Sequence, residues 1–145
     1  GPRAIHHLTS GKILISDTRL KKWFSAEQMK IMKEAVEDHR DSASHAPRSI
    51  YGKIVAEADR ELDPETVFRR TILYGRDHYP EMSKEQQWTR FTEHLEDKYS
   101  NTGYIKLWIP GSENEKKLKT IRELLTQPKK LRAMFESIFE ETEEG

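Results

Sequence analysis

The sequence contains no cysteine, no long hydrophobic run and no excess of charge of one sign. Without cysteine the chain forms neither a disulfide framework nor a thiolate metal site, which fits a reducing cytoplasm. No apolar stretch approaches the ~18 residues that a membrane-spanning helix needs. The 25 basic side chains balance the 25 acidic ones, which leaves only a local basic patch to attract nucleic acid or anionic lipid. We therefore expect a cytoplasmic protein without membrane or nucleic-acid partners.

Apolar residues are also scarce. They make up 34% of the chain and charged residues another 34%, whereas charged residues average roughly 25% in globular proteins. Such a composition is typical of amphipathic helices with charged outer faces. Three Trp, five Phe and five Tyr argue against disorder. The 145 residues predict one domain with a real core.

The chain begins with Gly1-Pro2 rather than with methionine. This start is typical of a protease scar left after tag removal, or of a piece from the middle of a longer protein. Both interpretations predict that native sequence before Arg3 is missing.

Capping signals and prolines divide the sequence into about six helices. The clearest starts have a glutamine three positions after the N-cap, or a proline directly after it: Ser25 with Gln28, Ser83 with Gln86, and Asp63-Pro64. The expected helices cover about residues 5–16, 26–40 and 49–62, and begin near 64, 84 and 112, with a restart at Pro128. Trp23 and Phe24 are expected to anchor the connection over residues 17–24. Residues 104–109 are largely apolar and alternate in the manner of a short strand. A lone strand has no partner here, so we expect an extended packing segment or a helical turn.

A histidine closes the apolar stripe of the helix expected over residues 26–40. The stripe recurs at helical spacing and places the imidazole on the buried face: Met29, Met32, Val36 and His39. An inward histidine can ligate a metal ion, although a lone one is more often a satisfied core residue.

An aspartate occupies a similar position on the next helix. Asp59 continues a stripe that is expected to be buried: Ile50, Tyr51, Ile54, Val55, Ala58 and Leu62. A carboxylate on a buried face is costly unless it is paired or metal-bound. His39 and Asp59, presented inward by consecutive helices, could hold a divalent cation. The alternative is a simple salt bridge from Asp59 to Arg40 or Lys53.

Two adjacent histidines stand near the start of the chain. His7 shares a helix face with Leu14 and with Ser10 or Gly11, which would point its ring inward. Spacing alone, however, favours a solvated or tag-like His6-His7 pair.

The segments AVEDHR, Pro-Arg-Ser and IYGKIVAEADRELD follow one another over residues 35–63. In this order they resemble the C-terminal half of HD-superfamily metal-dependent phosphohydrolases. The segment HHLTSGKIL, at residues 6–14, resembles the helix after the family's His-Asp doublet. The resemblance covers about residues 5–63. It implies an all-α fold, in which residues 1–63 form the back half of an HD-domain-like helical core and residues 64–145 a C-terminal helical extension.

The resemblance also implies roles for three residues. Asp59 matches the last ligand of the family's metal site, while His39 and His7 match auxiliary histidines that bind a second ion or face the substrate phosphate. The ion would be Mn, Ni, Zn, Fe or Mg. The doublet itself is absent, since no His-Asp dipeptide occurs in the sequence. We therefore expect weak metal binding and poor activity from these residues alone.

Basic residues near these positions would contact a substrate phosphate: Arg40, Arg48 and Lys53. Surface charge is the alternative for each. The sequence thus predicts a divalent-metal-dependent phosphohydrolase that acts on a small phosphate ester or nucleotide, with no catalytic side chain assigned. The alternative function is a non-catalytic helical binding or scaffold module. Apolar faces normally covered by upstream helices would favour a homodimer.

Overall fold

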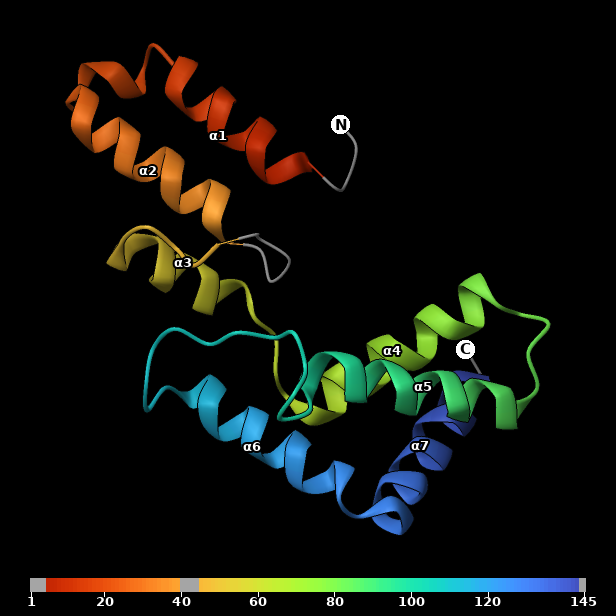
Figure 1. Cartoon of the computed structure of the whole chain (residues 1–145). Coiled ribbons are helices and arrows are strands. Elements are labelled where there is room, and N and C mark those ends of the chain that lie inside the picture. Colours follow the sequence, from red (N-terminus) through yellow and green to blue (C-terminus); the bar gives the residue numbers. More distant parts are fainter. Residues whose placement is uncertain (1–4, 40–44, 144–145) are drawn as a thin grey trace. The chain divides into compact units, whose positions relative to one another are not determined.

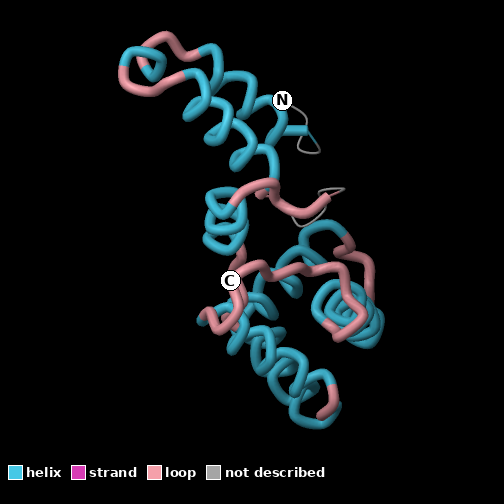
Figure 2. Tube along the Cα trace, turned by 60° about the vertical axis from the view of Figure 1, so that its left-hand side comes forward, coloured by secondary structure: helices cyan, strands magenta, loops and turns pink. Residues whose placement is uncertain are grey.

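The computed structural model describes residues 5–39 and 45–143. Over these ranges the chain forms seven α-helices and one short 3-10 helix and contains no strand, which confirms the all-α prediction (Figures 1 and 2). The helices separate into two compact units: residues 1–60 with 106–110 (unit 1), and residues 61–105 with 111–145 (unit 2). None of the described helices is long and apolar enough to cross a membrane.

Unit 1 contains α1 (His6–Ser16), the 3-10 helix Leu20–Lys22, α2 (Ala26–Asp38) and α3 (Ile50–Asp59). The first two α-helices run side by side as a hairpin (Figure 1). A glycine permits their close approach: Gly11 is buried, and a Cβ there would lie 2.8 Å from the Cγ of Glu37 on α2. The capping box predicted at Ser25 and Gln28 is present at the start of α2.

Small residues let α3 pack against α2. Gly52 and Ala56 are buried, and a Cβ at position 52 would lie 3.7 Å from the Cα of Ala35. The predicted buried stripe is instead exposed at five positions: Ile50, Tyr51, Ile54, Val55 and Ala58. That prediction is wrong because close packing against α2 uses the small face of α3. The helix also ends at Asp59, before the buried Leu62.

The connection between α1 and α2 is held by local hydrogen bonds rather than by buried rings. Trp23 is 81% exposed and Phe24 is 40% exposed, so the prediction that they anchor this connection is wrong. Their backbone amides donate to the carbonyl of Leu20, at 3.0 and 3.1 Å. The carboxylate of Asp17 accepts the amide of Arg19 at 2.8 Å. A turn closed in this way needs no buried aromatic side chain.

Unit 2 contains α4 (Pro64–His78), α5 (Lys84–Tyr99), α6 (Glu113–Leu125) and α7 (Pro128–Glu143). Asp63 caps α4 ahead of its first-turn proline, and Ser83 with Gln86 forms the predicted capping box of α5. Aromatic rings from three helices fill the core: the Phe91 centroid lies 5.5 Å from that of Phe68 and 5.2 Å from that of Phe135.

The segment over residues 104–109 is irregular, as predicted, and is neither helix nor strand. Its last residues belong to unit 1 and attach to α3. The backbone amides of Trp108 and Ile109 both donate to Oε1 of Glu57, at 2.5 and 3.0 Å. A buried carboxylate thus takes the place of a neighbouring strand.

Candidate functional site

The structure brings His39 and Asp59 together at the ends of α2 and α3. His39 is the C-cap residue of α2, and Asp59 is the last residue of α3. The Nε2 atom of His39 lies 3.9 Å from Oδ2 of Asp59. The imidazole is 14% exposed, whereas the carboxylate is 60% exposed. The prediction of a buried Asp59 is therefore wrong, because Asp59 is the last residue of α3 and its carboxylate reaches solvent beside the end of α2.

Arg60 ties these two helix ends together. Its buried guanidinium donates through Nη1 to the carbonyl of His39 at 2.7 Å and to the carbonyl of Ala56 at 2.9 Å. The last carbonyls of a helix have no partner within the helix, so a guanidinium that reaches them satisfies a backbone acceptor. The hydrogen bond to His39 therefore holds the end of α2 beside Asp59, the residue before Arg60.

The ring of His39 has a defined orientation. Its Nδ1 lies 2.5 Å from the carbonyl oxygen of Val36. Since a carbonyl only accepts, Nδ1 carries the proton, and in the neutral ring Nε2 presents a lone pair on the side of Asp59. Metal-ligating histidines commonly donate their second ring N–H to a backbone carbonyl in this way.

The separation of the pair is near that of two ligands on one ion. Nitrogen and oxygen atoms each about 2.1 Å from a tetrahedral ion are about 3.4 Å apart. The 3.9 Å gap between His39 and Asp59 is wider. Because the Asp59 carboxylate reaches solvent, a small rotation of its side chain can close the difference.

His6, rather than His7, lies against His39. The ring centroids of His6 and His39 are 5.6 Å apart, and those of His6 and His7 are 6.1 Å apart. His7 is half-buried on α1. Across residues 5–39 and 45–143, no three His, Cys, Asp or Glu side chains form a group that could hold a metal ion. The described part of the chain therefore offers a two-ligand pair with a further imidazole nearby.

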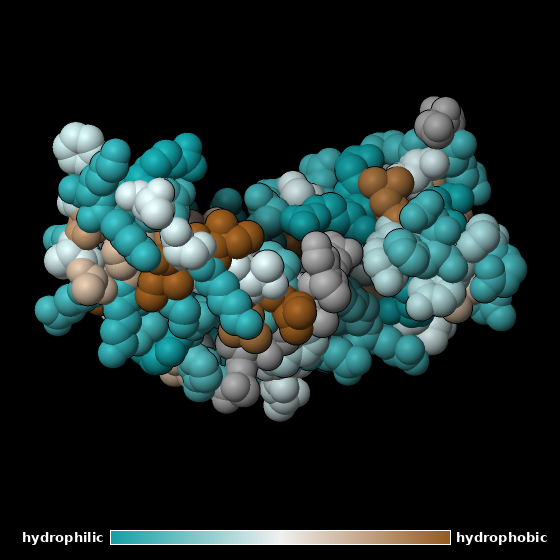
Figure 3. Space-filling view, turned by 90° about the horizontal axis from the view of Figure 1, so that it is seen from above, coloured by the Kyte–Doolittle hydropathy of each residue, from teal (hydrophilic) through white to brown (hydrophobic). Residues whose placement is uncertain are grey.

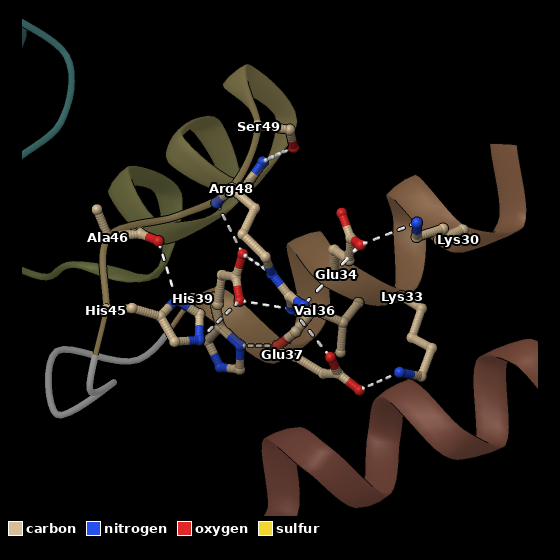
Figure 4. Close-up of polar contacts among 12 residues, drawn as sticks. Lys30, Lys33, Glu34, Val36, Glu37, His39, His45, Ala46, Arg48 and Ser49 are labelled. Carbon is tan, nitrogen blue, oxygen red and sulfur yellow. Dashed lines mark hydrogen bonds and ion pairs between the residues drawn. The ribbon is translucent and has the colours of Figure 1, made fainter. Parts of the chain in front are cut away.

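The fully buried carboxylate of unit 1 is Asp38. It is 1% exposed and accepts three hydrogen bonds from Arg48: from the backbone amide at 2.9 Å, from Nε at 3.0 Å and from Nη2 at 2.8 Å. The same Nη2 donates to Glu37 at 3.0 Å, and Figure 4 shows Arg48 reaching toward Glu34 and Glu37 on α2. Arg48 directly precedes Ser49, the N-cap residue of α3. The network therefore attaches the start of α3 to the end of α2.

The opposite charges of this network favour the ionised form of each member. Burial alone would raise the pKa of Asp38, but the hydrogen bonds and positive charge of Arg48 outweigh it and lower the pKa. Burial likewise opposes the ionisation of Glu37, whose pKa is nevertheless lowered by Lys33 and Arg48. Hydrogen bonding to Asp38 raises the pKa of the Arg48 guanidinium in return. All three groups are therefore charged near neutral pH.

The basic residues predicted to contact a phosphate differ in their surroundings. Arg48 is engaged by Asp38 and Glu37, which favours a structural role. Lys53 is half-buried on α3 and, among the described residues, has no carboxylate within ion-pair distance. Arg40 lies outside the described residues. A phosphate would thus compete with carboxylates at Arg48 but not at Lys53.

Sequence reasoning missed three buried charged residues of unit 1: Asp38, Glu57 and Arg60. Asp38 follows Ala35 by three residues on the same buried face of α2, so helical spacing held a signal for it. The partner of Asp38 is ten residues away across a loop, and no local pattern identifies such a pair. Comparison with protein-family models, with curated proteins and with solved structures finds no match for this chain.

Proposed function

We propose that His39 and Asp59 form part of a divalent-metal site, and that the activity it serves is hydrolysis of a phosphate ester or nucleotide. The observation that carries this proposal is the imidazole of His39, held through Nδ1 by the Val36 carbonyl with Nε2 at 3.9 Å from the Asp59 carboxylate. The resemblance of residues 5–63 to the C-terminal half of HD-superfamily phosphohydrolases supports it.

The donor set fits a borderline divalent ion. One imidazole nitrogen and one carboxylate oxygen suit Mn, Ni, Zn or Fe better than Mg, which prefers oxygen ligands. His6 and His7 stand on α1 as further donors. The chemistry that such an ion supplies when bound is activation of water and polarisation of a phosphoryl oxygen. Lys53 would stabilise negative charge on the phosphate, since a lysine serves as a point charge for such groups.

The site is incomplete by ligand count. A catalytic ion commonly has about three protein ligands and an open position. The described residues bring together two, and the sequence contains no His-Asp doublet. We therefore propose that these 145 residues bind a metal weakly and turn over phosphoesters slowly or not at all.

Metal titration tests the site directly. With Ni²⁺ or Zn²⁺ as the probe and calorimetry as the readout, His39→Ala and Asp59→Asn should each weaken binding by about tenfold or more. A matched control is the pair Asp77 and His78 on α4, whose side chains are 3.6 Å apart. Asp77→Asn and His78→Ala should leave the affinity unchanged. Binding that survives both unit 1 substitutions, for example at His6, would contradict the proposal.

Turnover tests the activity separately. The chain is assayed with Mn²⁺, Ni²⁺ or Zn²⁺ on a generic phosphate monoester and on a phosphodiester. Slow turnover that Asp59→Asn abolishes is the expected result if the pair serves hydrolysis. Vigorous turnover would show that the catalytic site is complete within these residues and that the missing doublet does not matter.

A further inference from the structure

The turn between α1 and α2 exposes an aromatic side chain, Trp23, that is not packed into the core. Trp23 is 81% exposed and Phe24, next to it, is 40% exposed. A tryptophan can bury more apolar surface than any other side chain, so leaving it in water forgoes a large stabilisation. Exposed apolar groups that gather in one place are typical of interaction surfaces.

Apolar exposure continues onto the end of α1. Ile13 is 64% exposed and Ile15 is 37% exposed, and both lie in the last turns before the connection. Figure 3 looks down onto α1 and shows brown, hydrophobic side chains among the teal ones. Ile13, Ile15, Trp23 and Phe24 are exposed residues at this end of the hairpin and are called the turn patch below, although Ile13 and Ile15, two positions apart, lie on different sides of α1.

Positive charge accompanies the turn patch. Residues 18–26 contain Arg19, Lys21 and Lys22 and no acidic residue. Arg19 is paired with Asp17 at 3.2 Å. Within the described ranges, no carboxylate lies at ion-pair distance from Lys21 or Lys22, and both lysines are exposed. Two unneutralised cations thus directly precede the exposed tryptophan.

We propose that the turn patch docks on a membrane surface rich in anionic lipid. Tryptophan rings favour the boundary between headgroups and acyl chains, and lysines beside them are attracted to anionic headgroups. The isoleucines favour lipid over single-stranded nucleic acid, whose bases stack on aromatic faces. This departs from the expectation of no membrane partner, which rested on net charge and on spanning length. Docking by a turn depends on neither.

Vesicle binding tests this proposal independently of the metal site. The probe is vesicles of phosphatidylcholine with about 30% phosphatidylserine, compared with phosphatidylcholine alone. The chain should co-sediment with the anionic vesicles and dissociate as salt shortens the Debye length. The emission difference between the chain and Trp23→Phe isolates Trp23, which should shift to shorter wavelength on binding. Trp23→Ala should weaken partitioning about 10- to 100-fold, and Lys21→Gln with Lys22→Gln about 30-fold.

A second lysine pair provides the matched control. Lys129 and Lys130 are adjacent and exposed on α7. Converting both to glutamine removes the same charge and should leave vesicle binding unchanged. The proposal is overturned if the chain does not bind anionic vesicles, or if the control pair and the turn variants lose binding equally. Preferential binding of a single-stranded oligonucleotide, lost in the Trp23→Ala variant, would assign the patch to nucleic acid and overturn it as well.

Discussion

The carboxylate of Asp38 accepts hydrogen bonds from both the backbone amide and the guanidinium of Arg48, which is ten residues further along the chain. Asp38 is 1% exposed, while the Arg48 side chain is 41% exposed. The pair therefore has one end in the core of unit 1 and the other at its surface. This asymmetry makes the two partners unequal in mutation: removing the arginine side chain leaves a buried negative charge, whereas removing the carboxylate leaves a cation that can turn to solvent.

We expect Arg48→Ala to destabilise unit 1 by about 2–4 kcal/mol, less than the loss of a fully buried pair because Arg48 is partly screened by water. Hydrogen exchange of the α2 and α3 amides measures the effect. Arg70→Ala serves as the control, because Arg70 is exposed on α4, and should change stability by less than about 0.5 kcal/mol. Unchanged protection of α2 and α3 in Arg48→Ala would show that the backbone amide alone satisfies Asp38.

The same pair predicts loss of stability in acid. The pKa of Asp38 is lower in the fold than in the unfolded chain, where an aspartate titrates near about 3.9. A lowered carboxyl pKa contributes stability that is present above the unfolded value and is lost as the pH falls through the folded one. The free energy of unfolding of the wild-type chain, measured with denaturant, should therefore fall as the pH drops below about 4. In Asp38→Asn it should fall less steeply with pH. Equal slopes would mean that the pKa of Asp38 does not differ between the folded and the unfolded chain.

Helix starts were predictable because their determinants are local. Ser25 with Gln28 and Ser83 with Gln86 satisfy each other's backbone groups within four residues, so the sequence alone carries the signal. Which face of a helix is buried depends instead on residues far away in the sequence. On α3 the strongest apolar periodicity identified the exposed face, because Gly52 allows a closer approach to α2 than any larger residue would.

The candidate site was predictable in part for the same reason. Helical spacing places His39 toward the interior, and the structure leaves its side chain 14% exposed. The proximity of Asp59 also follows from the order of the helices. The exposure of Asp59 and the burial of Asp38 depend instead on how α3 crosses α2, and that crossing is set by contacts between residues far apart in the sequence.

A third prediction concerns the irregular segment attached to α3. Glu57 is 7% exposed, and its Oε1 accepts the amides of Trp108 and Ile109. Hydrogen bonds to a charged acceptor contribute about 1.5–3 kcal/mol, so Glu57→Ala should speed exchange of these two amides by about tenfold or more. Glu57→Gln keeps one acceptor oxygen and should give an intermediate rate. Glu96→Ala, at an exposed position of α5, should have no effect on them. Identical rates in all four proteins would show that the segment is held by side-chain packing alone.

The last prediction is a reversal of sign at the crossing of α4 and α5. Gly75 is buried on α4, and a Cβ there would overlap Oε1 of Gln87 on α5. Gln87 cannot move freely, because its buried Nε2 donates to the carbonyls of Gly75 at 3.1 Å and Tyr79 at 2.9 Å. Gly75→Ala gains about 1 kcal/mol in helix propensity. It should nevertheless destabilise unit 2 by about 1–2 kcal/mol net, because displacing Gln87 leaves a buried amide unsatisfied.

The Gln87→Ala substitution removes the side-chain amide that a Cβ at position 75 would overlap. The Nη1 atom of Arg90, which a Cβ at position 75 would also approach at 2.9 Å, donates to the carbonyl of Thr71 at 3.0 Å, but it ends a long side chain that can shift into the space left by Gln87. The same Gly75→Ala change should then stabilise unit 2 by about 0.5–1 kcal/mol, because only the propensity gain remains. Denaturant unfolding of the four proteins of this double-mutant cycle measures the coupling between the two sites. If Gly75→Ala destabilises both backgrounds equally, the backbones of α4 and α5, and not Gln87, set the requirement for glycine at position 75.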